Sequence, residues 1–208
     1  MSFSIPQPLA LFPLSTVLFP GGWLPLKIFE PRYLDLVSRC WRERQVFGVV
    51  CLMQGAEAGP SEDGLRFERL GTLVELDDVD SDSAGILLVR CRGVQRFRWA
   101  GTPSQNSLGL WSAQAEILPD EAEQAPTPEL QRTAEALRQL EAQMRQQGVS
   151  LWTQPPRYAD AGWVANRWCE LLPLPQALKQ LSLAMSDPLA RLAWVDRWLQ
   201  DQAASLDD

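Results

Sequence analysis

The chain has 208 residues, of which 46% are hydrophobic and 22% are charged, the composition of an ordinary globular protein. Its net charge of -7 argues against binding along a phosphate backbone or on an anionic membrane surface, so neither nucleic acid nor a membrane is an expected partner. It has no histidine, which excludes Ser-His-Asp and Cys-His catalysis and His-ligated zinc.

The cysteines predict a reducing compartment. They are far apart in the sequence, form no C-x-x-C pair and are expected to be buried thiols: Cys40, Cys51, Cys91 and Cys169. The N-terminus lacks the basic region and unbroken apolar core of a signal peptide, and no apolar run is long enough to span a bilayer. We therefore expect a cytoplasmic protein with no metal site and no cofactor.

The apolar pattern predicts that residues 1–120 are mostly β-strand. A short strand is expected at residues 9–12, where Pro13 limits it to an edge or a strand end. A second strand is expected at residues 23–29, directly after a Pro-Gly-Gly turn, and a buried third strand at residues 46–53.

A helix is expected between the second and third strands. Pro31 suits the first position of a helix, and Glu30 before it places a carboxylate at the positive helix end. Apolar residues then recur at helical spacing: Tyr33, Leu34, Leu36, Val37, Cys40 and Trp41. We expect this helix to plug one end of the sheet.

The next segments predict further strands. We expect a surface loop at residues 54–64, a strand at 67–76, an acidic connection at 77–85, a long strand or bulged pair at 86–99 with its bulge at Gly93, and a last strand at 108–118. The acidic connection resembles a calcium loop only superficially, because it lacks the glycine and the terminal glutamate that such a loop needs.

A polar, proline-rich stretch at residues 120–128 is the best candidate for a domain boundary. Beyond it the apolar spacing is helical. The first helix is expected to begin at Thr127 and Pro128 and to stop at Gly148, and three more follow at 158–172, 175–185 and from 187 onward. We therefore predict two domains, residues 1–120 and 127–208.

Ordered motifs in the chain carry a family resemblance. Residues 11–14, 17–21 and 24–33 resemble the opening of the LON substrate-binding domain, with its FPL strand, PG turn and IFEPRY segment. The signature residues, for which a structural role is expected, are Phe12, Pro13, Phe19, Pro20, Gly21, Phe29, Glu30, Pro31, Arg32 and Tyr33. Residues 47–50, 71–75, 93–97 and 172–175 resemble later family segments in the same order.

The resemblance implies an α+β fold, a PUA-like β pseudo-barrel with one plugging helix, followed by a C-terminal helical bundle. In the family this domain recognises unfolded or extended polypeptide for ATP-dependent Lon proteases. No glycine here precedes a lysine, so the chain has no G-x-x-x-x-G-K-[ST] phosphate loop. The resemblance thus implies a stand-alone, non-catalytic recognition module, with a protease or ATPase in trans as a conceivable partner. An enzyme with an unrecognised centre is the least supported class.

The abundant tryptophans are the candidate binding residues. Aromatic clefts are common ligand sites, and core packing is the competing role for each ring. We expect a groove made by the barrel edge and the helical part, with five residues in contact with polypeptide: Trp99, Trp111, Trp152, Tyr158 and Trp163.

Two arginine-bearing motifs have competing interpretations. The stripe formed by Arg90, Arg92, Arg96 and Arg98 is typical of RNA binding in a PUA-like fold, or of pairing across the sheet with neighbouring carboxylates. The acidic total favours the pairing. Arg32 and Tyr33 form either a peptide-binding corner or a helix start in which the arginine satisfies a buried carbonyl or carboxylate. Helix-start chemistry favours the second.

Overall fold

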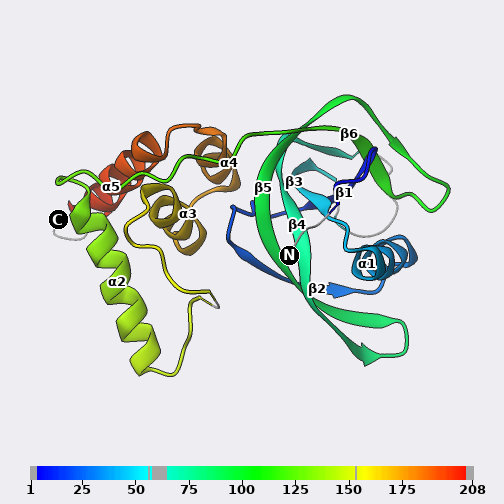
Figure 1. Ribbon diagram of the computed structural model, residues 1–208, viewed down its shortest axis with the longest axis horizontal. Helices are drawn as coiled ribbons and strands as arrows, with labels where there is room; N and C mark the ends of the chain where they lie inside the picture. The colour runs from blue at the N-terminus through cyan, green and yellow to red at the C-terminus, as the bar shows by residue number, and fades with distance from the viewer. Residues whose placement is uncertain (1–3, 56, 58–64, 153, 205–208) are drawn as a thin grey trace. The chain divides into compact units, whose positions relative to one another are not determined.

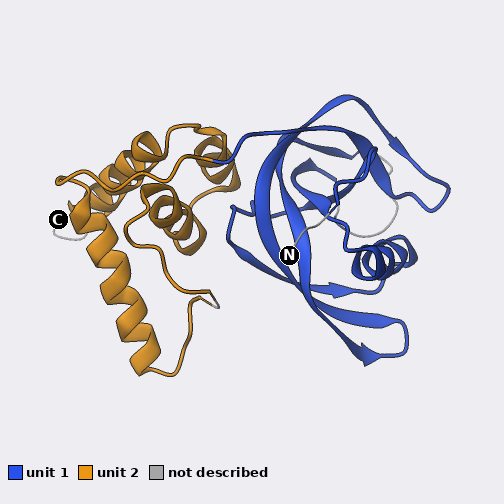
Figure 2. Ribbon diagram, viewed as in Figure 1, with its two compact units in different colours: residues 1–120 blue, residues 121–208 orange. Residues whose placement is uncertain are grey.

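A computed structural model describes residues 4–55, 57, 65–152 and 154–204. The chain divides into two compact units, residues 1–120 and 121–208, named here the strand unit and the helical unit (Figure 2). Most of the expected loop at residues 54–64 lies outside the described residues. Within the described ranges, no helix has both the length and the apolar character needed to cross a membrane.

The strand unit contains one sheet that closes on itself (Figure 1). Its described strands are β1 (Leu9–Leu14), β2 (Trp23–Ile28), β3 (Phe47–Gln54), β4 (Arg66–Ser83), β5 (Ile86–Gln105) and β6 (Trp111–Ile117). Their order is β2-β5-β4-β3-β1-β6, and a further pairing of β5 with β6 completes a ring. The predicted α+β class is confirmed, and the sheet is a mixed ring, with β1 and β3 parallel, rather than a true barrel.

Glycine permits the strands to approach closely where the ring curves. A Cβ atom on Gly71 would lie 2.3 Å from the carbonyl oxygen of Val49, so only glycine fits at this position. In the pairing of β4 with β5, Val74 lies opposite Gly93 and Thr72 opposite Arg96, so β5 holds one extra residue there. The bulge predicted at Gly93 is thereby confirmed.

The Pro-Gly-Gly turn is bonded to this bulge. Gly21 N–H donates to the Gly93 carbonyl at 2.8 Å, and Gly93 N–H donates to the Gly22 carbonyl at 2.9 Å. The Thr72 hydroxyl donates to the Leu18 carbonyl at 2.6 Å. The Pro-Gly-Gly turn and the segment at Gly93, which are about 70 residues apart in sequence, are therefore joined into one structural element. The bonds that join them are additional to the regular hydrogen bonds between paired strands.

Helix α1 (Pro31–Glu43) begins at the expected proline and packs its apolar face into the core of the ring. Its Tyr33 ring stacks on Phe12 with the ring centroids 3.8 Å apart. Trp41 ends the apolar series that follows helical spacing, and it is 51% exposed. It directly follows the buried Cys40, and successive helix positions are rotated by about 100°, which turns Trp41 away from the buried face.

The acidic connection predicted at residues 77–85 is instead strand. β4 continues to Ser83 and pairs with β5 from Ile86 onward. Arg90 on β5 forms ion pairs with Asp77 at 3.1 Å and Asp78 at 3.4 Å. The local sequence did not indicate this strand, because its carboxylates are stabilised by an arginine on the neighbouring strand.

The helical unit contains α2 (Gln131–Gln146), α3 (Ala161–Leu171), α4 (Gln176–Ala184) and α5 (Pro188–Ala204). Two helices start about three residues later than predicted. Residues 128–130 form a turn, and the Thr127 side chain does not cap α2. Asp160 caps α3 by accepting from Gly162 N–H at 3.1 Å, which leaves Tyr158 outside the helix.

Buried arginines hold the helical unit together. Arg191, whose side chain is 1% exposed, donates to Glu121, to Asn166 Oδ1 at 2.8 Å and to the Ser182 carbonyl at 3.0 Å. It also donates to the Met185 carbonyl at the end of α4. One guanidinium thus binds a carboxylate and two carbonyls at a helix end, where the Ser182 carbonyl also accepts from Met185 N–H at 3.2 Å.

Candidate functional site

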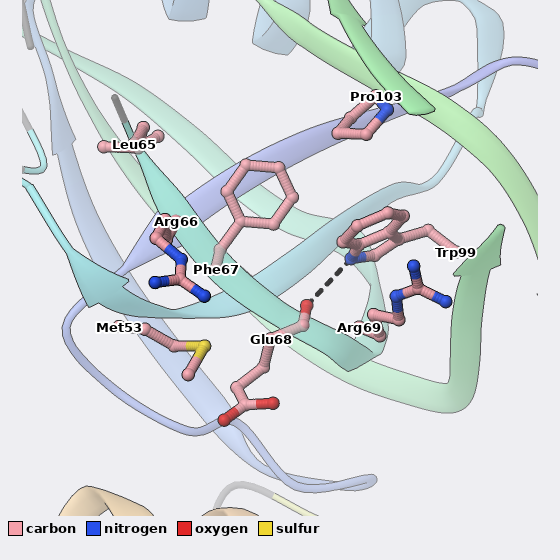
Figure 3. A pocket seen from close by; sticks show the side chains of 8 residues that line it. All are labelled: Met53, Leu65, Arg66, Phe67, Glu68, Arg69, Trp99 and Pro103. Atoms are coloured by element: carbon pink, nitrogen blue, oxygen red, sulfur yellow. Dashed lines mark hydrogen bonds between the residues drawn. The ribbon is translucent and has the colours of Figure 1, made fainter. Parts of the chain in front are cut away.

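A pocket of about 330 Å³ opens on the strand unit at the start of β4 (Figure 3). Ligand pockets in proteins span roughly 300–1,000 Å³, so this one has room for one or two side chains. It is lined by Met53, Leu65, Arg66, Phe67, Glu68, Arg69, Trp99 and Pro103.

The pocket exists because two strands diverge. The pairing of β4 with β5 ends at Leu70 opposite Arg98, whereas β5 stays beside β6, with which it is paired at Phe97 opposite Ile117 and still at Trp99 opposite Ala115. Residues 66–69 of β4 therefore lie beyond the stretch paired with β5, and Arg66 and Phe67 are paired with β3. The Trp99 indole N–H donates to the Glu68 carbonyl at 2.8 Å (Figure 3), which satisfies one backbone acceptor where the ladder has stopped.

The pocket floor is aromatic. The Phe67 ring meets the rings of Trp99 and Trp111 edge-on, with 5.6 Å between centroids in each case. Two expected binding residues, Trp99 and Trp111, are thus joined by a phenylalanine that sequence reasoning missed. Met53 was also missed and is 59% exposed. Its place at the end of the apolar run at residues 46–53 was the one sequence signal for it.

Two arginines lie at the pocket rim. The Arg69 guanidinium lies 5.0 Å from the centre of the Trp99 ring, and Arg66 lies beside Met53 (Figure 3). Among the described residues, neither arginine forms an ion pair with a carboxylate. Glu68, the other charged residue of the lining, accepts the indole bond through its backbone rather than its carboxylate. The rim therefore presents cationic groups beside an apolar floor.

The other three expected residues meet in the helical unit. Trp163 has its ring centroid 5.4 Å from both Trp152 and Tyr158. The Arg167 guanidinium lies 5.9 Å from the Trp152 ring and 5.8 Å from the Trp163 ring, and Arg138 lies 5.0 Å from the Tyr158 ring. The five expected residues thus fall into two aromatic clusters, one in each unit.

The IFEPRY segment has structural contacts. Arg32 pairs with Glu30 at 2.8 Å and donates to the Gly109 carbonyl at 3.2 Å, which ties α1 to the turn before β6. Burial raises the pKa of Tyr33 to about 12, so its phenol stays neutral. A second pocket of about 300 Å³ lies beside this segment and includes Phe29, whose side chain is 56% exposed.

The arginine stripe on β5 is interrupted. Arg90 is paired with carboxylates of β4, and Arg92 pairs with Glu75. Arg96 is 7% exposed, because the bulge at Gly93 changes the alternation along the strand. Of the four, only Arg98 is exposed and has no carboxylate partner among the described residues. This arrangement does not favour phosphate binding along the stripe.

The cysteines are buried free thiols. Burial raises the pKa of Cys40 to about 11 and that of Cys91 to about 12, and it also raises the pKa values of Cys51 and Cys169. Thiols with raised pKa values stay protonated at neutral pH and are poor nucleophiles. Within the described ranges, no three residues of metal-binding type cluster together.

Comparisons with known proteins agree on one family. Residues 8–201 match the family described as "ATP-dependent protease La (LON) substrate-binding domain". A 96-residue segment is 32% identical to Lon protease 2 of Myxococcus xanthus and covers 45% of this chain and 11% of that protein. The chain therefore spans only a small part of this curated relative.

Solved structures show the same fold. The crystal structure of a Lon N-terminal domain protein from Xanthomonas campestris superposes with a TM-score of 0.72 at 30% sequence identity, covering 91% of this chain and 97% of that one. The N-terminal domain of Lon protease from Mycobacterium avium complex superposes with a TM-score of 0.58 at 15% identity, covering 93% and 98%.

Proposed function

This chain belongs to the LON substrate-binding domain family, and we propose that it recognises unfolded or extended polypeptide without itself performing chemistry. The observation that carries this proposal is the aromatic pocket on the strand unit, next to a stretch of β4 that has no β5 partner. Large apolar side chains are buried in folded proteins, so a pocket for them selects segments that are not folded.

Extended polypeptide suits this surface for a second reason. Backbone groups at a strand edge bond to an added chain whatever its sequence, while neighbouring pockets select its side chains. β4 residues 66–69 provide such an edge beside the floor formed by Phe67 and Trp99. The aromatic cluster of Trp152, Tyr158 and Trp163 is the contact that we propose for the helical unit.

The family match supports a recognition role over catalysis. It extends over residues 8–201 and concerns a substrate-binding domain, and the sequence has neither histidine nor a phosphate-binding loop. As a finer proposal, the module acts as an adaptor that passes its bound segment to a protease or ATPase in trans.

Binding to a reduced and alkylated protein that cannot refold tests the proposal. We expect the full chain to retain this protein, and Met53→Glu to weaken retention because it places a carboxylate at the apolar rim. Trp111→Ala and Trp163→Ala test the two aromatic clusters separately. Trp41→Ala is the matched control, because Trp41 is equally large, 51% exposed and outside the pocket lining.

Equal binding of the folded and unfolded forms of the test protein would contradict the proposal. Salt dependence separates it from RNA binding, because phosphate contacts weaken steeply as salt rises and apolar contacts do not.

A further inference from the structure

We propose that the pocket at the start of β4 selects a segment in which one large apolar residue is flanked on both sides by aspartate or glutamate. This inference rests on the proposed function and adds a charge preference to it. Apolar burial provides the affinity, and the two rim arginines decide which apolar segments are accepted.

The apolar part of the preference follows from the floor. Phe67 and Trp99 meet edge-on, and Met53 and Pro103 extend the apolar surface on either side. The volume of about 330 Å³ has room for a Phe, Leu or Met side chain together with part of its backbone. Methionine at the rim adapts to side chains of different shape, so the floor selects size more than identity.

The acidic part follows from the arginines. Arg66 and Arg69 both line the pocket, and neither pairs with a carboxylate of the described residues. Arg90 and Arg92, further along the same sheet, are each paired with carboxylates, although the whole chain is acidic. With Glu68 included, the charged lining formed by the described residues sums to 2 − 1 = +1, which complements an acidic segment.

The separation of the arginines favours flanking carboxylates over a single chain-terminal carboxylate. Figure 3 shows Arg66 beside Met53 and Arg69 beside Trp99, on the two sides of Glu68. Three strand positions separate their Cα atoms by about 10 Å. In an extended ligand, the residues two positions before and after the apolar residue share its face and lie about 13 Å apart, within reach of two long arginines.

Fluorescence anisotropy with the full chain and three labelled 12-residue peptides tests the inference. Each peptide has one central Phe, and the positions two before and two after it are both Glu, both Gln or both Lys. One exposed ion pair raises affinity by up to about fivefold, and the Glu peptide can form two. We therefore expect the Glu peptide to bind about tenfold more tightly than the Gln peptide, and the Lys peptide to bind most weakly.

The double variant Arg66→Glu/Arg69→Glu should reverse this order. Arg42→Glu/Arg197→Glu makes the same change in net charge at exposed positions outside the pocket, and should leave the order unchanged. Circular dichroism of both variants verifies that they are folded. Raising the salt concentration should reduce the difference between the Glu and Gln peptides and leave their shared affinity largely intact.

Failure of the inference can be told apart from failure of the proposed function. If the three peptides bind equally, or only the unfolded protein binds, the charge preference is wrong and polypeptide recognition stands. If neither the peptides nor the unfolded protein bind, both are wrong. Tighter binding of oligo(dT), abolished by the double reversal, would assign the pocket to nucleic acid. A dimer abolished by that reversal would assign it to a second copy of the chain.

Discussion

The two units of this protein use arginine in opposite ways. In the strand unit the largest fully buried side chains are phenylalanines such as Phe47 and Phe97, and two arginines without a carboxylate partner among the described residues line a pocket. In the helical unit the largest fully buried side chains are Arg167 and Arg191 themselves. The largest fully buried side chains are therefore aromatic in the strand unit, where the buried Arg96 retains 7% exposure, and cationic in the helical unit.

The difference follows from where each unit satisfies its backbone. A closed ring of strands bonds most backbone groups through its ladders, so its side chains are left free for packing and for ligands. Short helices end in carbonyls that their own turns do not fully bond, and Arg191 donates to two carbonyls at the end of α4. We therefore expect a buried arginine of the helical unit to determine stability, and we propose that a rim arginine of the strand unit determines specificity.

Arg191→Ala should have the largest effect on stability. Removing this guanidinium takes a charged donor away from Glu121, Asn166 and two carbonyls, and breaking a buried pair costs about 3–5 kcal/mol. Urea denaturation with hydrogen exchange resolved by unit measures the loss, which should be confined to the helical unit. Arg197→Ala, on the exposed side of the same helix, is the control. A change below about 1 kcal/mol for Arg191→Ala would break the comparison.

Gly71→Ala should be the most damaging small change in the strand unit. The added methyl would lie 2.3 Å from the Val49 carbonyl oxygen and 2.9 Å from the Phe97 ring, and overpacking of this kind costs about 3 kcal/mol. The free energy of unfolding and the exchange rates of β3 and β4 amides measure it. Ser104→Ala, at an exposed position of β5, serves as the reference and should be nearly neutral. Equal stabilities would show that the ring does not need this close approach.

The helical unit should lose stability as pH rises through a window set by Glu170. Burial raises its pKa from 4.5 to about 7, against the opposing effects of Arg167 and Lys179. Between these values the folded state holds a proton that the unfolded chain has lost, so the free energy of unfolding falls as pH increases. Because the side chain is 23% exposed, we expect a fall of about 1–2 kcal/mol.

Glu170→Gln tests this assignment by removing the titrating group. Denaturation of the variant at about pH 4.5 and about pH 7.5 should give closely similar stabilities. Asp196 does not interfere, because its bond from Arg132 keeps its pKa below 3.8 and its contribution is lost only below the window. A wild-type protein that gains stability over this range would refute the prediction.

The smallest expected effect is the difference in stability lost when a tryptophan hydrogen bond is removed from each of the two units. The Trp168 indole donates to the Thr133 carbonyl at 3.0 Å in a buried setting, whereas the Trp99 bond to Glu68 is partly buried. A buried acceptor left unpaired costs more than one that water can reach. We expect Trp168→Phe to cost about 2 kcal/mol and Trp99→Phe about 1 kcal/mol, measured by urea denaturation. The reverse order would overturn the contrast between the units.

Sequence reasoning worked where the cause was local. The helix start at Pro31, the bulge at Gly93 and most strand positions follow from residues that restrict their own backbone or alternate between two faces. It failed where a distant partner decides. The acidic stretch at residues 77–83 is strand because Arg90 lies opposite it, and Arg96 is buried because of the preceding bulge.

The candidate site likewise contains residues that the sequence predicted and residues that it did not. Trp99 and Trp111 were predicted from composition, and the rings do meet in one cluster, but the connecting residue Phe67 carried no distinguishing signal. The rim arginines also carried no distinguishing signal, because the sequence around them resembles the sequence around the paired arginines.

The sequence by itself determined a strand-rich part followed by a helical part, because apolar period, prolines and glycines act on their own neighbours, and its ordered motifs carried the resemblance that implied a closed sheet. Only the tertiary structure decided where a pocket opens and which arginines line it. Both depend on the point at which β4 diverges from β5, just beyond Leu70 and Arg98, while β5 stays paired with β6. That divergence is a property of three strands together, and none of their sequences specifies it alone.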